Sequence, residues 1–161
     1  MKTLEKIIKE KEWYYVNSNI TSKNFPKPKV IETEGARIIK MKGYFTSQQA
    51  LDEIKRQGCR PANAWELALF DREKIEKGSW LIAVGQLWRD SNGYHRVPHV
   101  LAFSDGGFSF GLGFFVPDWD SLLCLLAFCD KTLDTKKLEK EFDSLSLPDE
   151  LVINNVTYIK K

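Results

Sequence analysis

The first residues of the chain alternate between apolar and polar positions with the period of an amphipathic helix. Thr3 lies directly before the apolar positions as a candidate N-cap, and the pattern predicts a short helix that ends near Lys11. Residues 17–29 are polar, contain two prolines and predict a loop or an extended arm. The apolar face of the helix consists of Leu4, Ile7 and Ile8.

Two short apolar pairs follow the arm. Val30–Ile31 and Ile38–Ile39 predict two short strands, and Gly35 between them marks a break. A hairpin of these two strands is one option, but their spacing leaves the register open.

The next segment carries clear signals for the ends of a helix. Thr46 or Ser47 is able to cap its N-terminus, and Gly58 is placed to adopt the left-handed conformation that ends a helix. Apolar residues at helical spacing lie between these signals and predict a buried face. This face consists of Ala50, Leu51 and Ile54.

A second helix is predicted after an extended step at Arg60–Pro61, because a proline disfavours helical backbone at the residue before it. Asn63 lies three residues before Glu66, which is the spacing of a capping box at the start of a helix. The helix carries five apolar residues, and Gly78 is expected to end it. These residues are Trp65, Leu67, Ala68, Leu69 and Phe70.

From residue 79 the pattern changes to that of strands. Residues 80–88 (WLIAVGQLW) and 94–103 (YHRVPHVLAF) predict a hairpin around the turn at Asp90–Gly93, which contains an Asn-Gly pair. Residues 108–116 (FSFGLGFFV) predict a third antiparallel strand with small residues on its outer face. The large residues on its other face are Phe108, Phe110, Leu112 and Phe114.

The last third of the chain predicts three more elements. Residues 121–129 (SLLCLLAFC) are apolar throughout, and their length favours a buried strand. A solvated helix is expected from about Thr135. A closing hairpin is expected over residues 151–159, with Asn154–Asn155 at its turn.

Together these elements predict an α+β fold in which two helices are followed by a twisted antiparallel sheet. The chain has 161 residues, of which 43% are hydrophobic and 29% charged, the profile of one globular domain over residues 1–161. Residues 1–43 supply an N-terminal helix and arm, residues 44–130 the core, and residues 131–161 a C-terminal extension with a helix and a hairpin.

Charge and targeting signals point to a cytoplasmic protein. The 24 basic and 22 acidic residues leave a net charge of +2, which does not favour a nucleic-acid partner. The N-terminus lacks the apolar stretch of a signal peptide, and no apolar run is long enough to cross a membrane. A cellular protein and a phage or viral protein made in a cytosol would both show this pattern.

The three cysteines fit a reducing compartment. Cys59, Cys124 and Cys129 are few and odd in number, so we expect each to be a small buried residue and expect no disulfide framework.

The order of helix, Arg-Pro step, helix and strands rich in Trp, Gly and Phe resembles the C-type-lectin-like superfamily. Residues 46–70 (TSQQALDEIKRQGCRPANAWELALF) are similar to the paired-helix segment of its bacterial branch, which includes formylglycine-generating-enzyme-like domains and the variable proteins of diversity-generating retroelements. Residues 83–100 and 117–128 look similar to the strand segments of that branch, so the resemblance covers about residues 44–130. The residues that carry it are Gly58, Arg60, Pro61, Trp65, Glu66 and Leu67.

The resemblance implies a ligand-binding fold, but the sequence lacks the calcium-binding tripeptides of C-type lectins. Asp118 and Asp120 are the nearest pair of carboxylates, and they fall short of the six to eight oxygens that calcium requires. The formylglycine-generating branch binds copper(I) through two cysteines, for which Cys124 and Cys129 are the candidates. Residues five apart on a strand point to opposite faces, so we interpret both as core residues.

No cofactor or metal is expected elsewhere. His95 and His99 would share a zinc ion on a helix, but the adjacent Pro98 indicates a strand, where four residues span roughly 13 Å. The two histidines have no neighbouring serine motif or acid and base pair, so a catalytic triad is not indicated.

The sequence therefore favours a non-catalytic ligand- or protein-binding module. The partner is expected to be an unidentified protein or small ligand, and a homo-oligomer is a further option. One alternative is a copper oxidase of the formylglycine-generating type, and another is a nucleic-acid accessory protein of phage type. The binding surface is expected on loops that carry Trp88, Asp90, Asn92, Tyr94, Asp105, Trp119 and Asp120.

Overall fold

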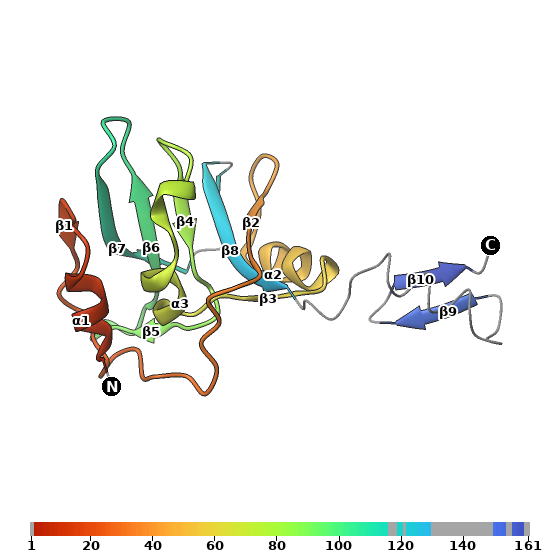
Figure 1. Ribbon diagram of the computed structural model, residues 1–161, viewed down its shortest axis with the longest axis horizontal. Coiled ribbons are helices and arrows are strands. Elements are labelled where there is room, and N and C mark those ends of the chain that lie inside the picture. Colours follow the sequence, from red (N-terminus) through yellow and green to blue (C-terminus); the bar gives the residue numbers. More distant parts are fainter. Residues whose placement is uncertain (1, 116–118, 121, 130–149, 154–155, 160–161) are drawn as a thin grey trace.

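The computed structural model describes residues 2–115, 119–120, 122–129, 150–153 and 156–159 (Figure 1). The predicted helix from Thr135 and the predicted turn at Asn154–Asn155 lie outside the described residues. The predicted closing hairpin is confirmed in its two strands, β9 (Glu150–Ile153) and β10 (Val156–Ile159), which pair antiparallel.

An eight-stranded sheet forms the centre of the fold. Its order is β1-β7-β6-β4-β8-β2, with β3 paired to β8 and β5 paired to β6. The strands are β1 (Tyr15–Val16), β2 (Ala36–Lys40), β3 (Cys59–Pro61), β4 (Trp80–Ile82), β5 (Trp88–Arg89), β6 (His95–Ala102), β7 (Phe108–Phe114) and β8 (Leu123–Cys129).

The sheet is mixed, which corrects the prediction of an antiparallel sheet. Strand β4 runs parallel to β8, and β1 runs parallel to β7. Strand β8 is apolar along its whole length and buried on both faces, so it is most stable in the sheet interior between β4 and β2. Since β4 and β7 are both antiparallel to β6, β8 runs in the same direction as β7.

Three of the predicted helices are present, and each begins at a predicted N-cap. Helix α1 (Leu4–Lys9) is capped by Thr3, and α2 (Ser47–Arg56) is capped by Thr46. Helix α3 (Ala64–Leu69) begins at the capping box in which Asn63 and Glu66 each accept a hydrogen bond from the other's backbone N–H. A mixed fold of helices and strands is compatible with the predicted α+β class.

The sequence pattern predicts that helix α3 extends to Gly78, but the helix ends at Leu69. Phe70 already adopts extended backbone, and the Lys11 ammonium donates to the carbonyl oxygens of Ala68 and Phe70 at 2.9 and 2.8 Å. Asp71 then accepts a hydrogen bond from the Glu73 N–H and starts a short 3-10 helix over Arg72–Lys74. Lys11, which is 57 residues before Ala68 in the chain, thus supplies hydrogen bonds to the free carbonyl groups at the end of the helix. The local sequence pattern cannot predict such a contact.

The two faces of the sheet carry two apolar cores. Helices α1 and α3 pack on one face with β6, β7 and β8, as Figure 1 shows, and α2 packs on the other face with β4 and β8. Large buried residues of the first core are Leu4, Phe25, Leu67, Leu81, Phe110 and Leu126, and those of the second are Ile39, Ile54, Val97, Trp119 and Leu125.

Three strand predictions need correction. Val30–Ile31 is not a strand, because Asn63 and Glu66 hold this part of the arm by side-chain hydrogen bonds instead of a ladder. Residues 80–88 form two separate strands, β4 and β5, that both pair with β6. Phe114 is 50% exposed, because it lies past the end of the core that buries the other large residues of β7.

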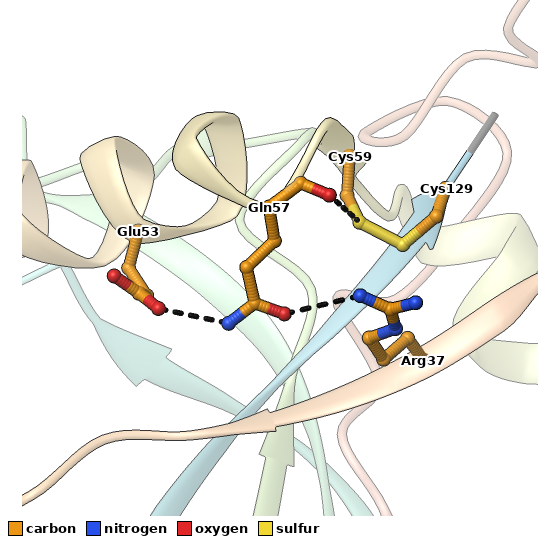
Figure 2. Close-up of a disulfide and its surroundings, with 5 residues drawn as sticks. All are labelled: Arg37, Glu53, Gln57, Cys59 and Cys129. Carbon is orange, nitrogen blue, oxygen red and sulfur yellow. Dashed lines mark hydrogen bonds between the residues drawn. A yellow bond between two sulfur atoms is a disulfide. The ribbon is translucent and has the colours of Figure 1, made fainter. Parts of the chain in front are cut away.

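The prediction of three unpaired cysteines is wrong, because Cys59 and Cys129 form a disulfide (Figure 2). The two residues are directly opposed on β3 and β8, with their Cα atoms 4.0 Å apart. The Cys59 sulfur lies 3.4 Å from the carbonyl oxygen of Gln57. Only Cys124 is free, and its burial raises the pKa of its thiol.

We predict that the disulfide contributes strongly to stability, because it closes a loop across a sequence separation of 70 residues. Chain-entropy reasoning gives about 4 kcal/mol for a loop of this length. Replacing both cysteines (Cys59→Ser with Cys129→Ser) should lower the free energy of unfolding in urea by about that amount. Dithiothreitol should destabilise the wild type similarly and leave the double variant unchanged; equal urea midpoints of wild type and variant without reductant would contradict the prediction.

Candidate functional site

Four of the predicted site residues lie together around the turn between β5 and β6. Asp90 holds this turn, because its carboxylate accepts hydrogen bonds from the backbone N–H groups of Asn92 and Tyr94 at 2.9 and 3.0 Å. The same carboxylate pairs with Arg96 at 3.4 Å. Asp90 and Asn92 are therefore turn residues, and Trp88 packs partly against the first core.

The exposed part of this corner is an aromatic pair. The rings of Tyr94 and Phe114 meet edge to face with centroids 5.7 Å apart, and the Arg96 guanidinium lies 4.3 Å from the centre of the Phe114 ring. Arg96 also donates to the carbonyl oxygens of Leu112 and Gly113. Tyr94 and Phe114 nevertheless remain 60% and 50% exposed, so this corner also presents aromatic surface to solvent.

The other predicted residues lie elsewhere. Asp105 is on the turn between β6 and β7, at the end of β6 opposite Tyr94. Trp119 is only 2% exposed, which corrects its place on the binding surface; its ring packs against Phe45 and Phe115 in the second core. Asp120 is exposed and accepts a hydrogen bond from the Leu122 N–H. The structure therefore divides the predicted surface into separate regions.

A groove of about 570 Å³ lies beside Asp105. Tyr14 lines this groove, and the hydroxyl end of its side chain contacts Asp105 and Gly107. Its hydroxyl donates to the Asp105 carboxylate at 3.0 Å, and its ring lies so close to Gly107 that a Cβ there would be 2.1 Å from ring carbons. The groove is lined by Glu12, Trp13, Tyr14, Arg72, Glu73, Asp105, Gly106, Gly107 and Phe108.

Arg72 is held equally firmly. Its guanidinium lies 4.5 Å from the centre of the Trp13 ring and 4.6 Å from that of Phe108, and it donates to the carbonyl oxygen of Glu12. The three carboxylates and the single guanidinium of the lining leave two net negative charges. The groove thus combines aromatic surface with both hydrogen-bond acceptors and a donor, and it disfavours anionic ligands.

The hydrogen bond between Tyr14 and Asp105 is stable at neutral pH. The Gly107 N–H and the Tyr14 hydroxyl both donate to Asp105 and lower the pKa of its carboxyl. The same hydrogen bond raises the pKa of the Tyr14 hydroxyl. Tyr14 is therefore protonated while Asp105 is ionised, which is the state in which the hydroxyl donates to the carboxylate.

Sequence reasoning identified Asp105 but missed Tyr14 and Arg72. The turn at 104–107 is recognisable from its Asp-Gly-Gly pattern. Tyr14 lines the same groove as Asp105 only because β1 pairs in parallel with β7. That pairing brings Tyr14 beside Phe108 through a 2.8 Å backbone hydrogen bond between them. Neither Tyr14 nor Arg72 lies in a local sequence pattern that reports such a distant partner.

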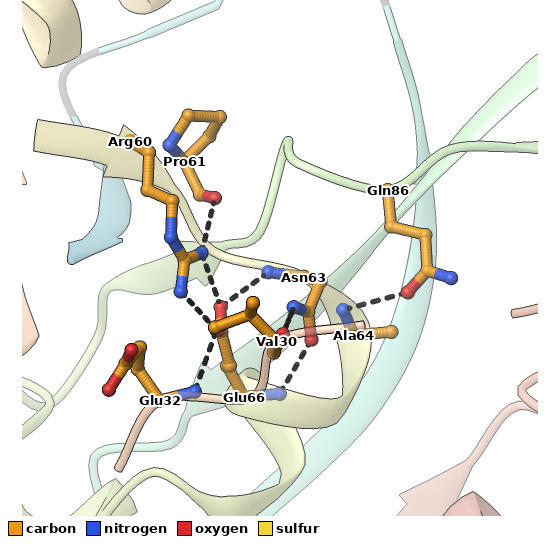
Figure 3. A network of polar contacts seen from close by, with 8 residues as sticks. All are labelled: Val30, Glu32, Arg60, Pro61, Asn63, Ala64, Glu66 and Gln86. Carbon is orange, nitrogen blue, oxygen red and sulfur yellow. Dashed lines mark hydrogen bonds and ion pairs between the residues drawn. The ribbon is translucent and has the colours of Figure 1, made fainter. Parts of the chain in front are cut away.

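A second groove, of about 710 Å³, lies between the arm, β2 and the C-terminal end of α3. Beneath it, Glu66 is 1% exposed and joins three segments of the chain (Figure 3). Arg60 donates to both of its carboxylate oxygens at 2.6 and 3.1 Å, and the backbone N–H groups of Glu32 and Asn63 each donate at 3.0 Å. Four donors fix this carboxylate, so its role is structural.

His99 lies on the other face of the sheet, packed against the Trp80 ring and directly over Gly111. Its position on β6 confirms the predicted strand, while His95 on the same strand is exposed. Burial, with a smaller contribution from Arg96, lowers the pKa of His99 to about 4. The described residues contain no group of three or more metal-ligating side chains, and none of their helices is long and apolar enough to cross a membrane.

Comparison of the chain with protein-family models, with curated proteins and with solved structures finds no match. The assignment of function therefore depends on the geometry of the grooves and surfaces.

We predict that Glu66→Gln lowers the free energy of unfolding by about 2–3 kcal/mol. The amide NH2 of glutamine would face Arg60 or a backbone N–H, so two donors would oppose each other. The lost stability is smaller than for a fully buried ion pair, because Arg60 is partly exposed. Urea unfolding measures the change. The matched control is Glu76→Gln, which removes the exposed ion pair with Lys40 and should leave stability nearly unchanged; equal effects of the two substitutions would disprove the structural role.

We also predict that His99 makes the fold sensitive to mild acid. Its folded pKa of about 4 is below the unfolded value of 6.5, so the unfolded state binds the proton more readily. The stabilising effect of His99 is complete above pH 6.5 and is lost as the pH falls to 4, by about 3 kcal/mol. Urea unfolding at several pH values should show this slope in the wild type and in His95→Gln, and a reduced slope in His99→Gln. A slope unchanged in His99→Gln would assign the acid sensitivity to other groups.

Proposed function

We propose that the protein is a non-catalytic ligand-binding module whose site is the groove beside Asp105, and that its ligand is a carbohydrate. The observation that supports this most is the fixed, exposed ring of Tyr14. It is 64% exposed, yet Asp105 and Gly107 hold it in one orientation. A ring immobilised before binding loses little entropy when a ligand packs on it.

The chemistry of the lining matches a hydroxylated ring. The C–H face of a sugar ring is apolar and packs on an aromatic face, while its hydroxyl groups both donate and accept hydrogen bonds. Glu12, Glu73 and Asp105 supply acceptors, and Arg72 supplies a donor. The net negative charge of the groove argues against phosphate groups and therefore against the nucleic-acid alternative.

The resemblance of residues 44–130 to the C-type-lectin-like superfamily supports the same class of function, but through a different chemistry. The proposed site involves no calcium, since the sequence lacks the calcium-binding tripeptides. It is also built partly from Trp13 and Tyr14, which precede the segment that carries the resemblance.

The formylglycine-generating alternative loses support from the cysteines. It requires the sulfurs of Cys124 and Cys129 on one copper ion, whereas Cys129 is bonded to Cys59 and Cys124 is buried in the first core.

We predict that the protein binds one or more members of a panel of neutral, amino and acidic mono- and disaccharides, measured by isothermal titration calorimetry. Tyr14→Ala should weaken this binding at least tenfold because it removes the aromatic surface. Gly107→Ala should weaken it similarly, because the new Cβ would displace the Tyr14 ring.

The matched control is Tyr15→Ala, which removes the neighbouring exposed tyrosine that does not line the groove, and it should retain wild-type affinity. Equal loss in Tyr14→Ala and Tyr15→Ala, or no binding by any saccharide of the panel, would refute the proposal. Binding of a simple amine such as putrescine, with no saccharide bound, would assign the groove to cations instead.

A further inference from the structure

The disulfide between Cys59 and Cys129 lies at the surface of the molecule, whereas the third cysteine is buried. Cys59 and Cys129 are both partly exposed, and Cys124 is only 4% exposed. The two bonded cysteines line a groove of about 600 Å³ together with Gly58 and Phe128. Open space adjoins them, because a Cβ added at Gly58 would meet nothing within 4 Å beyond its chain neighbours. Disulfides that solvent reaches are the ones that thiols reduce most readily.

The backbone hydrogen bonds between β3 and β8 do not include the cysteine pair. The Cys129 N–H donates to the Gly35 carbonyl at 3.1 Å, so the backbone groups of Cys129 face β2. Successive residues of a strand direct these groups to opposite neighbours, so Phe128 is hydrogen-bonded to Arg60 on β3. Cys59 and Cys129 are thus a non-bonded pair, and the disulfide holds the two strands together at this end.

The disulfide also fixes the end of helix α2 to β8. Gln57 is the C-cap of α2, and Cys59 follows two residues later as the first residue of β3. Figure 2 shows a second connection at this corner, an exposed 3.3 Å hydrogen bond from the Arg37 guanidinium to the Gln57 side chain. A single exposed hydrogen bond contributes little to stability, because water competes for both groups. Opening the disulfide therefore releases residues 57–59 from β8.

The neighbouring structure does not depend on the disulfide in the same way. The ladder between the two chain segments continues at the Ala62 N–H, which donates to the Leu126 carbonyl at 3.0 Å. The reduced Cys59 also has a partner, since its sulfur lies 3.4 Å from the Gln57 carbonyl oxygen, which is able to accept an S–H hydrogen bond. Reduction thus loosens one corner and leaves the sheet in place.

We infer that the disulfide between Cys59 and Cys129 is a reversible redox site that releases the corner of α2 and β3 when a small uncharged dithiol reduces it. Glu32 and Glu34 line the same groove, which disfavours an anionic reductant. This site is independent of the groove beside Asp105.

The reaction is a thiol–disulfide exchange in two steps. One thiolate of the dithiol attacks a sulfur of the disulfide, forms a mixed disulfide and expels the other protein sulfur as a thiolate. The second thiol of the reductant then attacks its own end of the mixed disulfide and releases the second protein sulfur. Two electrons and two protons pass to the protein, which gains two thiols, and the dithiol becomes a cyclic disulfide.

The first test is reduction of the native protein by dithiothreitol, followed by labelling with iodoacetamide and mass spectrometry. The rate of reduction should rise in proportion to the dithiothreitol concentration. Cys59 and Cys129 should be labelled and Cys124 should not, because it stays buried. Oxidised glutathione added after removal of the dithiol should restore the original disulfide.

Three outcomes of this test would overturn the proposal. A rate that is independent of dithiothreitol concentration would show that the disulfide reacts only after the protein unfolds. Labelling of Cys124 would show the same. Failure of the disulfide to form again would show that the reaction is not reversible.

The second test is 15N relaxation by NMR, which measures the local mobility of each backbone N–H. On reduction, the order parameters of residues 57–59 should fall from about 0.85 to below about 0.6. Those of Ala62 and Tyr14, whose N–H groups are hydrogen-bonded to other strands, should not change. Unchanged order parameters at residues 57–59 would refute the release of the corner, and a fall at all of these residues would indicate unfolding instead.

Two variants complete the test. The double variant Cys59→Ser with Cys129→Ser should show the mobile corner with or without dithiothreitol. The matched control Cys124→Ala should respond to dithiothreitol as the wild type does; a control that no longer responds would assign the effect to Cys124. If the double variant does not fold, the reduced wild type decides, because it lacks the same bond.

Discussion

The burial of β8 is the constraint on which most of the structure depends. Its seven residues are apolar or thiol-bearing and lie in the sheet with a core on each face. A strand of this kind needs neighbours on both sides along its whole length, because exposed backbone groups beside buried side chains would be costly. Strands β4 and β3 supply one side in succession, β2 supplies the other, and the disulfide from Cys129 fixes the end.

The same constraint explains how the arm is positioned. Because β3 and β2 flank the end of β8, Arg60 on β3 and the arm that leads into β2 both come close to α3. Glu66 joins these segments through Arg60 and the Glu32 N–H, at a place where an unpaired carboxylate would be unfavourable. One buried charge thereby replaces the strand pairing that the apolar pair Val30–Ile31 predicted.

The two proposed sites lie toward opposite ends of the sheet, and they use different physical resources. The groove beside Asp105 uses side chains that are already immobilised, with Tyr14 fixed on Gly107 and Arg72 held between two rings. The disulfide site uses a covalent bond between Cys59 and Cys129, at a strand pair that the backbone hydrogen bonds do not hold.

The sequence by itself determined the features that depend on neighbours within a few residues. The caps at Thr3, Thr46 and Asn63, the left-handed Gly58 and the turn at Asp90–Gly93 follow from local hydrogen bonding and backbone preference, and all are present. The strand over residues 123–129 was also predictable, because an apolar run of that length suits a buried strand.

Only the tertiary structure decided which distant segments meet. The parallel pairing of β1 with β7 and of β4 with β8, the bond between Cys59 and Cys129, and the burial of Trp119 join residues from separate parts of the chain. No local preference records such contacts, because they result from the shared burial of apolar surface across the whole sheet. For the same reason Asp105 was identified as a site residue, while its partner Tyr14, 91 residues earlier, was not.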